Sequence, residues 1–545
     1  MSGHRRHYSR SRRSSESSSP GSRSTSRCSM RPPTTTEEDD YDAPGGGHRR
    51  RKRRPSASLP ERRRRSHRSH SHSWVLLNRA GAQRDDDFRR DDRTTSSSSA
   101  MSCTSRGEDI SVSFDIVEPP GTSVLTVDCP LASTTTTTSS KSTGSVIAAH
   151  RDVVLLEITS HENKHPSDSY VDLFVYQAAS CDPDPADPSR RRRRRRRPSL
   201  VLLPSAGGPL INPHLKRTKY MGIMSCTSND DDDSPPSSSS FVVAYLEMSP
   251  TINEVRLFRP GSGQWEAFKN LHVHGANGGL DLRWWSTDAV VTYGRRYMIL
   301  VDYYHGMVLI DLMSSTPSHS QSSSSSETNP PSPSSPPPRL RYVPLPVDKV
   351  GDPVDMEWGG RGSPKACRRV CVTRHGVKFV SIDSQHWSNF GVGHRHVLTW
   401  SHRFRITTWS LREHDYTWRR DATMHEQEFW DAVDGGDDRR RRFPVLPHVQ
   451  PRFPVVDVDN PDVVVFRLEK KPDYRHGDEP KWMIEVDLRK KALLAATAYS
   501  KETDGRSGDV ETINSARMKS GFRPIPSELP QYLDGGGQAC KTRRR

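Results

Sequence analysis

The sequence predicts an all-β protein: a β-propeller-like domain of short antiparallel hairpins that carries long disordered loop insertions. Three observations lead to this prediction. Short runs rich in Val, Ile, Leu and aromatic residues recur from Ser73 onward, and Gly, Pro, Asp or Ser bounds each one, as expected for strands separated by turns. Several of these runs pair into hairpins across polar turns. Helical periodicity over eleven or more residues is nearly absent, so strands must form most of the core.

The predicted strands follow one another closely along the chain. They lie within residues 73–79, 111–117, 151–158, 171–177, 200–204, 241–248, 296–312, 340–346, 376–383, 404–411, 462–469 and 481–499. The stretches 296–312 and 481–499 each contain an outgoing strand, a polar turn and a return strand. One short helix is predicted, over residues 422–433 ("ATMHEQEFWDAV").

The stretch "FRPGSGQWEAF" (258–268) shows how the hairpins are built. Pro fixes its own backbone angle and the two Gly residues adopt positive φ at little cost, so the chain reverses easily. Roughly twenty to twenty-five strands fit a pair of sandwiches or a propeller of about six four-stranded blades. In a propeller, we expect Trp265, Trp418 and the Leu-Pro ends of "LVLLP" and "YVPLP" to pack between blades.

Composition divides the chain into three parts. Residues 1–72 form an Arg- and Ser-rich arm with nineteen Arg or Lys and seven Asp or Glu, which is +12 of the total charge of +16. This arm has too few apolar residues to form a core and is predicted to be disordered. The propeller-like domain spans 73–500, with disordered insertions near 133–143, 182–199, 229–240 and 314–338, and 501–545 is predicted to be a disordered tail. Loop length costs only about 0.6 kcal/mol per doubling, so a β scaffold tolerates such insertions.

Composition also limits the environment of the protein. The eight cysteines show no paired spacing typical of a secreted disulfide framework, and the start lacks the apolar stretch of a secretory signal. No window approaches eighteen consecutive apolar residues, so no membrane-spanning helix is predicted. We therefore expect a nuclear or cytoplasmic protein, with an organelle transit peptide as the less favoured alternative.

Three sets of residues are candidates for metal binding or catalysis. His272 with His274 and His394 with His396 have a spacing that places two imidazoles on one face of a strand, but no further ligands follow. Cys367 and Cys371 lack a second pair. Asp302 and Asp311 end adjacent predicted strands, where carboxylates accept hydrogen bonds from turn amides, although acid–base work is conceivable. No nucleophile elbow, P-loop or dinucleotide motif is present, so we expect no catalytic residue, metal or cofactor.

Binding hypotheses rest on tryptophans and basic tracts. Adjacent residues on a strand point to opposite faces, so one of Trp284 and Trp285 is expected to pack inward and the other to be available to a partner. The alternative is that both fill gaps in the core. Two basic runs resemble nuclear import signals and would also attract nucleic-acid phosphates: Arg49, Arg50, Arg51, Lys52, Arg53 and Arg54, and Arg62, Arg63, Arg64 and Arg65. Ser199 follows a run of arginines and Pro198 and is a candidate for a basic-directed kinase. A solvated tail without specific function is the alternative for the basic runs.

The order of these runs resembles the plant domain-of-unknown-function 1618 family, which is abundant in grasses. The resemblance extends from about Ser73 to Tyr499, and residues 300–411 carry its most specific part, including "MILVDYYHGMVLIDL" and "LRYVPLP". Members resemble the β-propeller-like domains that accompany F-box proteins, although no F-box helices are visible here. The family has no assigned catalytic residues, so the resemblance implies none.

Together these features predict a non-enzymatic protein-interaction module whose partner the sequence does not identify. The alternative is nonspecific association with RNA or DNA in the nucleus through the basic arm. A third possibility is a propeller enzyme, which would need polar groups that converge on a central channel.

Overall fold

The computed structural model divides the chain into two units, Met1–Arg68 and Ser69–Arg545, and the residues that it describes all lie in the second. These are 73–83, 98–128, 141–161, 169–178, 181–182, 194–195, 197–204, 220–226, 241–248, 253–275, 285–313, 337–347, 364–385, 403–435, 445–470, 481–499 and 524–533. The basic arm and most of the insertions predicted from the sequence lie outside these residues.

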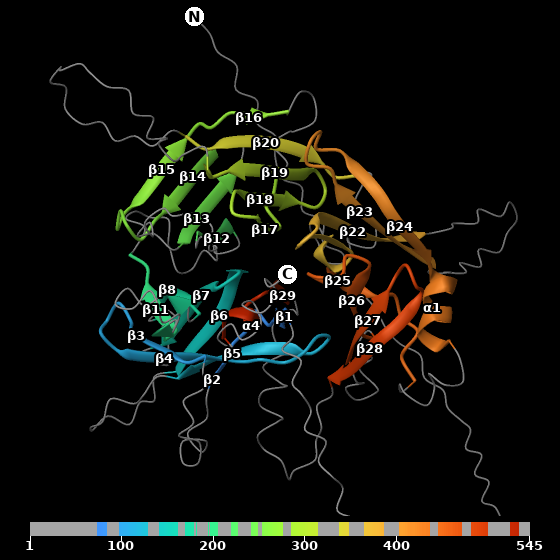
Figure 1. The fold of residues 1–545 in the computed structure, drawn as a ribbon, viewed down its shortest axis with the longest axis horizontal. Coiled ribbons are helices and arrows are strands. Elements are labelled where there is room, and N and C mark those ends of the chain that lie inside the picture. The colour runs from blue at the N-terminus through green and yellow to red at the C-terminus, as the bar shows by residue number, and fades with distance from the viewer. Residues whose placement is uncertain are drawn as a thin grey trace, which may run out of the picture. The chain divides into compact units, whose positions relative to one another are not determined.

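Six sheets of four to six strands follow one another along this unit and form a ring (Figure 1). The first three are given from the inner strand outward. Sheet one contains β29 (Ile525–Ser527), β1 (Val75–Leu77), β5 (Thr122–Asp128), β4 (Asp109–Asp115) and β3 (Ala100–Cys103), with β2 (Ala82–Gln83) also on β5. Sheet two contains β6 (Lys141–His150), β7 (Val153–His161), β8 (Ser169–Gln177) and β11 (Ser199–Leu202). Sheet three contains β12 (Met221–Ser225), β13 (Phe241–Met248), β14 (Asn253–Phe258) and β15 (Trp265–Lys269).

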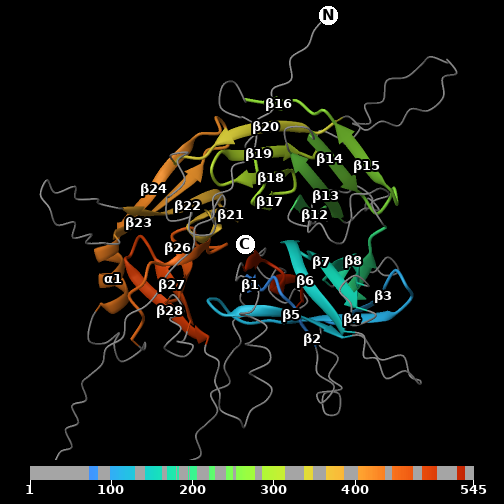
Figure 2. The ribbon, with the colours of Figure 1, turned by 180° about the vertical axis from the view of Figure 1, so that it is seen from behind.

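The other three sheets complete the ring, which Figure 2 shows from behind. Sheet four contains β17 (Ala289–Tyr293), β18 (Tyr297–Asp302), β19 (Gly306–Asp311), β20 (Arg339–Pro344) and β16 (Val273–His274). Sheet five contains β21 (Arg368–Thr373), β22 (Gly376–Gln385), β23 (Arg403–Leu411) and β24 (Trp418–His425). Sheet six contains β25 (Arg452–Val456), β26 (Val463–Leu468), β27 (Lys481–Asp487) and β28 (Ala492–Tyr499). Beside these sheets, β9 (Cys181–Asp182) pairs with β10 (Arg194–Arg195).

The predicted all-β propeller-like fold is confirmed, and the core explains why its strands are continuous apolar runs. Every residue of β13 is buried. Its alternate side chains belong to two different apolar clusters, with Phe241 and Val243 facing sheet two and Val242 and Ala244 facing sheet four. Among the described residues, six such clusters lie between the six pairs of neighbouring sheets. A strand buried on both faces needs apolar residues at every position, not only at alternate ones.

Two tryptophans lie between sheets, as the sequence predicts. Trp265 on β15 donates its indole N–H to the carbonyl oxygen of Pro204, which follows β11 of sheet two, at 3.1 Å. Trp418 on β24 makes the equivalent bond to the carbonyl oxygen of Pro344, at the end of β20 of sheet four, at 2.8 Å. The hairpin before Trp265 contains Gly263 at φ 66°, a backbone conformation that favours glycine. The turn within residues 258–268 therefore has a structural role, because it places Trp265 between sheets two and three.

The first and last described segments close the ring in one sheet. β1 pairs antiparallel with β29 and parallel with β5, so sheet one joins residues near 75 to residues near 526. This corrects the prediction of a disordered tail over 501–545 for residues 524–533 alone, because the rest of that stretch lies outside the described residues. Leu529 is fully buried, and Ile525 and Leu533 are 8% and 7% exposed in the cluster between sheets one and two. Only a few apolar residues mark this segment in the sequence. Their structural role becomes clear only from the apolar cluster between sheets one and two, into which they pack.

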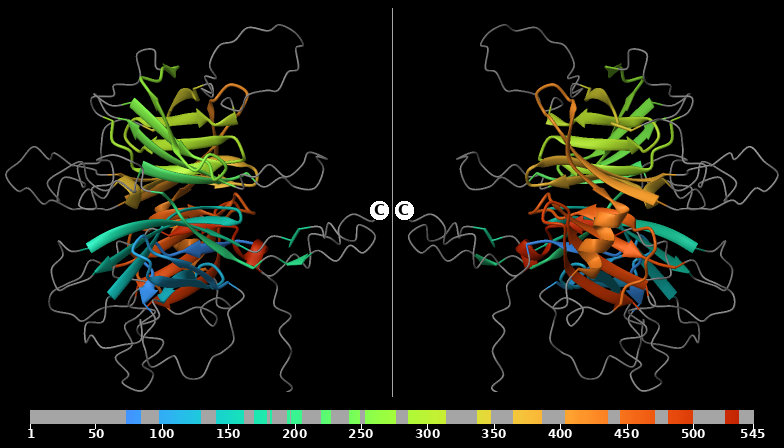
Figure 3. Two further views of the ribbon diagram at one scale, coloured as in Figure 1. Left: turned by 90° about the vertical axis from the view of Figure 1, so that its left-hand side faces the viewer. Right: turned by 90° about the vertical axis from the view of Figure 1, so that its right-hand side faces the viewer.

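In the described residues, the helices are few and short. The α1 helix covers Glu426–Asp434 and lies on the outside of the ring, against β23, β24 and β28 (Figures 1 and 3). The sequence predicts this helix from residue 422, but Ala422–His425 continue β24 because they pair with β23. The others are α4 (Pro530–Leu533) and a 3₁₀ turn, η7 (Pro364–Ala366). No helix in the described part of the chain is long and apolar enough to cross a membrane.

Candidate functional site: a cationic central cavity

A cavity of about 610 Å³ lies where the inner strands of the six sheets meet. Its walls include residues of β29, β6, β12, β17, β21 and β25, which face the middle of the ring in Figures 1 and 2. The inner strands run in the same direction. Arg369, near the beginning of β21, bonds to Pro524 before β29, and Arg374, just after β21, contacts Glu528 just after β29. The cavity therefore has a start rim, where these strands begin, and an end rim, where they end.

Positive side chains dominate the lining of this central cavity. Seven cationic residues and two carboxylates belong to it, an excess of five positive charges: Arg79, Arg151, Arg295, Lys365, Arg368, Arg369 and Arg374, against Asp288 and Glu528. Charges of one sign around a concave, low-dielectric site produce a focused potential that attracts the opposite charge. The cavity is thus suited to bind an anion.

The start rim is organised around the backbone of Tyr303, in the turn between β18 and β19. The Tyr303 N–H donates to Asp288 Oδ2 at 3.0 Å, and the Tyr303 carbonyl oxygen accepts a bond from Arg368 Nη1 at 2.9 Å. The neighbouring Arg369 extends the other way and donates from Nη2 to the carbonyl oxygen of Pro524 at 2.5 Å. Both guanidinium groups are therefore fixed by neutral acceptors, and no carboxylate among the described residues forms an ion pair with either of them.

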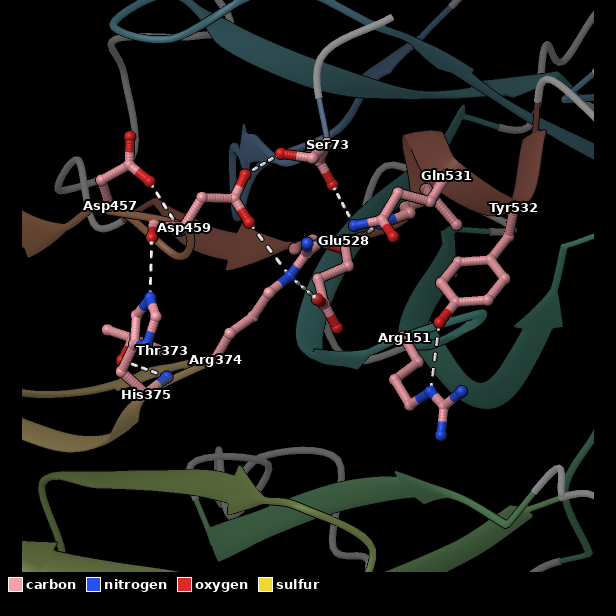
Figure 4. A network of polar contacts seen from close by, with 12 residues as sticks. Ser73, Arg151, Thr373, Arg374, His375, Asp457, Asp459, Glu528, Gln531 and Tyr532 are labelled. Atoms are coloured by element: carbon pink, nitrogen blue, oxygen red, sulfur yellow. Dashed lines mark hydrogen bonds and ion pairs between the residues drawn. The ribbon is translucent and has the colours of Figure 1, made fainter. Parts of the chain in front are cut away.

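The end rim carries a network that joins three sheets (Figure 4). Arg374 Nε lies 3.0 Å from Asp459 Oδ1, after β25, and 3.2 Å from Glu528 Oε1, after β29. Ser73 donates its hydroxyl to Asp459, and its carbonyl oxygen accepts a bond from Gln531 Nε2 at 2.5 Å. The positive charge of Arg374 is therefore compensated within the protein, unlike that of Arg368 and Arg369 on the start rim.

Beside this network, Arg151 donates from Nε to the Tyr532 hydroxyl at 3.1 Å (Figure 4). Arg151 follows β6 with φ 54°, in the left-handed region. The C-terminal segment thus contacts three cavity arginines: Pro524 holds Arg369, Glu528 holds Arg374 and Tyr532 holds Arg151.

The wall between the rims is mostly apolar. Ala149 of β6, Val291 of β17, Val372 of β21 and Pro526 of β29 line it and are partly exposed. Phe453 of β25 also lines the cavity and has φ 54°, beside a shift of register between β25 and β26. A left-handed conformation is strained for a bulky residue, and such strain is concentrated at binding sites in proteins.

A serine, a histidine and an aspartate meet at the end rim, but not in the order of a catalytic triad. Ser225 donates its hydroxyl to Asp152 Oδ1 at 2.5 Å, and its backbone N–H donates to His150 Nδ1 at 2.9 Å. Burial, with a contribution from the charge of Arg151, lowers the pKa of His150 to about 3, so the ring is neutral. A base must accept the proton of the nucleophile's hydroxyl; here the hydroxyl proton points to a buried carboxylate instead. The three residues join β6 and β12 structurally.

The structure places several residues that the sequence singles out. Trp285 is the inward-facing tryptophan: it is 6% exposed, and its indole N–H donates to Thr287 Oγ1 at 3.0 Å. Trp284, the other candidate for a partner, lies outside the described residues, as do the basic runs 49–54 and 62–65. Ser199 is exposed at the beginning of β11, opposite Gln177.

The weaker candidates have structural partners. Asp302 accepts the N–H groups of Ser286 and Tyr304 at 2.7 and 2.9 Å, and Asp311 forms an ion pair with Arg296 at 2.7 Å. His272 and His274 lie edge to face with ring centroids 4.9 Å apart, whereas His394 and His396 are outside the described residues.

Cys371 is buried, and its sulfur accepts the backbone N–H of Val456 at 3.5 Å. The sulfur of nearby Cys367 instead lies 3.5 Å from the carbonyl oxygen of Pro364. Among the described residues, no three His, Cys, Asp or Glu side chains gather as a metal site.

Sequence reasoning missed the cavity arginines. Arg368 and Arg369 occur in "ACRRVCV", a stretch in which the sequence analysis singles out only Cys367 and Cys371. The available signal is two adjacent arginines at the first positions of a strand that opens a new sheet. Their convergence with Arg79 and Lys365 depends on closure of the ring and cannot be seen locally.

Comparisons with known proteins find a family model that matches part of the chain. No curated protein matches. Among solved structures, a tail fibre of Staphylococcus aureus phage P68 is 8% identical, over 78% of this chain and 94% of that chain, with a TM-score of 0.12, a likeness that supports no conclusion. The family model described as a protein of unknown function (DUF1618) matches residues 301–465, from the end of β18 to the middle of β26, and confirms the resemblance there.

Proposed function

We propose that this protein is a non-enzymatic binding module of the β-propeller class, and that its central cavity receives an anionic group of its partner. The excess of five positive charges in the cavity lining is the observation that carries this proposal. The cavity opens among six inner strands fixed by six apolar clusters, so its charges are held in place before a ligand arrives. Such preorganisation reduces the entropy lost on binding.

The groups that line the cavity are suited to holding a ligand more than to transforming one. Guanidinium groups remain protonated at all ordinary pH values and bind carboxylates or phosphates with two parallel hydrogen bonds. The imidazole of His150 is neutral, and its Nδ1 is already occupied by the Ser225 N–H. These features favour a binding role over a propeller enzyme, which stays the third hypothesis.

Titration with a simple anion tests the proposal. The full chain is titrated with inorganic phosphate at constant ionic strength, with thermal unfolding as the readout. We expect a saturable rise in melting temperature that Arg368→Gln/Arg369→Gln abolishes. The matched control Arg412→Gln/Arg420→Gln removes the same charge from exposed positions of the same sheet and should keep the rise. Equal responses of the two double variants would mean that phosphate acts through general exclusion from the surface, and the proposal would fail.

Association with nucleic acid through residues 1–72 is a second proposal, favoured by the net charge of +12 in that segment. Contacts with several phosphates would give an affinity that falls steeply with salt. Substituting Arg62–Arg65 by glutamine should weaken retention of the full chain on immobilised single-stranded DNA at low salt. Unchanged retention would contradict this proposal and leave the cavity proposal intact. Nuclear import, plant origin and the likeness to F-box-associated propellers stay predictions.

A further inference from the structure

We infer that the central cavity binds an amphipathic organic anion, with its phosphate or carboxylate head on the start rim and its apolar body against the middle wall. This inference rests on the proposed function and goes beyond it, because it specifies the orientation and the chemical class of the ligand. It follows from how charge and apolar surface are distributed along the cavity.

The start rim has donors for an anionic head. Each guanidinium has five N–H groups. Toward the described residues, Arg368 and Arg369 each donate a single hydrogen bond, to a carbonyl oxygen. Lys365 and Arg79 add two further positive charges to this end of the lining, and Asp288 is the carboxylate that opposes them. Four cations against one carboxylate make this rim the more positive end of the described lining.

The end rim is less suited to a head group. Asp459 and Glu528 flank Arg374 at 3.0 and 3.2 Å, so its charge is compensated before any ligand binds. An external anion would have to displace these carboxylates or remain near their negative charge. Arg151 and Arg295 also line this end, which therefore has three cations against Glu528 and the neighbouring Asp459. The start rim, with four cations against one carboxylate, keeps the larger positive excess, and this difference orients an incoming anion.

The middle wall is suited to an apolar body. Ala149, Val291, Val372 and Pro526 are partly exposed to the cavity and present no charge. Phe453 adds an aromatic side chain whose left-handed backbone holds it at the lining. A cavity of about 610 Å³ is within the range of roughly 300–1,000 Å³ that small-molecule sites occupy. An aromatic or short aliphatic body would bury the apolar surface of the middle wall, whereas inorganic phosphate would leave it exposed to water.

The experiment compares four probes on the unmodified full chain by isothermal titration calorimetry: 1-naphthyl phosphate, 1-naphthoate, inorganic phosphate and 1-naphthol. We expect naphthyl phosphate to bind at least about tenfold more tightly than inorganic phosphate, since burial of a fused ring contributes several kcal/mol before the costs of binding. Naphthol, which lacks the head, should bind at least about tenfold more weakly than naphthyl phosphate, because it cannot form charge-assisted hydrogen bonds with the guanidinium groups. Naphthoate shows whether the head site accepts carboxylate as well as phosphate.

Variants separate the head from the body. Arg368→Lys/Arg369→Lys retains charge but loses the planar donors, so all anionic probes should bind more weakly, while Arg412→Lys/Arg420→Lys should leave them unchanged. Phe453→Ala should weaken naphthyl phosphate and leave inorganic phosphate unchanged. Variants that fail to fold do not decide the matter, because the four-probe comparison uses the unmodified chain.

The outcomes are distinguishable. If inorganic phosphate binds as tightly as naphthyl phosphate, the cavity takes an anion without an apolar body, so this inference fails and the proposed function stands. If naphthol binds as tightly as naphthyl phosphate, the anionic head contributes nothing to binding, and the assignment of the head to the start rim is wrong. If none of the anions binds, both the inference and the proposed function fail.

Discussion

Replacing Leu529 by alanine tests whether the C-terminal segment closes the ring. Leu529 lies between β29 and α4, is fully buried and belongs to the apolar cluster between sheets one and two. The substitution removes three carbon atoms and leaves a cavity that the surrounding sheets fill only in part. Leu→Ala changes at such sites cost about 2–5 kcal/mol. Replacing a leucine in a disordered tail would not change the free energy of unfolding. A packed segment and a disordered tail therefore predict clearly different results.

The assay is urea unfolding of the full chain, followed by tryptophan fluorescence, with midpoints compared at equal slope. Leu494→Ala on the edge strand β28 is the matched control, because Leu494 is 45% exposed and should cost no more than about 0.5 kcal/mol. Leu533→Ala, at 7% exposure in the same cluster as Leu529, should behave like Leu529→Ala. If Leu529→Ala unfolds at the same urea concentration as Leu494→Ala, closure by this segment is refuted.

Three further predictions concern the sheets and two buried titratable groups. Trp418→Phe removes the bond to the carbonyl oxygen of Pro344, and it should lower the free energy of unfolding by about 1–2 kcal/mol in urea titrations; no change would mean that the bond does not link the sheets. Since burial holds the pKa of His150 at about 3 in the folded state, below its unfolded value, the unfolded state binds the extra proton and stability falls as pH decreases through 6.5 toward 3. His150→Asn should reduce that slope by up to one proton, or about 1.4 kcal/mol per pH unit, and an unchanged slope would contradict the assignment. Burial, together with the charge of Asp457 and a smaller contribution from Glu118, raises the pKa of Glu485 to about 7, so the folded state binds the extra proton between pH 4.5 and 7 and stability falls as the pH rises through this range. Glu485→Gln should therefore stabilise the protein at pH 8 by more than at pH 5, and an equal effect at both pH values would exclude a buried carboxylate.

Local sequence is enough to predict many of the strands. The run "FVVAYLEM" matches β13 over the same residues, 241–248, and "RYMILVDYYHGMVLIDL" contains β18 and β19 around a turn. β-branched and aromatic residues favour extended backbone, and Gly, Pro and Asp favour reversal, over only a few residues. Packing of Trp265 and Trp418 between sheets follows from the same repeat.

The helix boundary required information from elsewhere in the chain. Residues 422–425 have a sequence compatible with α1, but they hydrogen-bond to β23, and this pairing outweighs their local preference. In the same way, Trp284 and Trp285 are equivalent in sequence, and only the packing of sheet four shows that Trp285 is buried.

By itself, then, the sequence determined an all-β chain of hairpins, its propeller-like class and the concentration of positive charge in the first 72 residues, because each depends on composition or on neighbouring residues. Tertiary structure alone decided that Ile525–Ser527 completes the sheet begun by Val75–Leu77, and that Arg79, Lys365, Arg368 and Arg369 face one cavity. Hundreds of positions separate Val75–Leu77 from Ile525–Ser527, and Arg79 from Lys365, Arg368 and Arg369. Only the closure of six sheets into a ring brings them together. The free energy of that closure comes from burial of apolar surface between neighbouring sheets, which depends on residues far apart in the sequence.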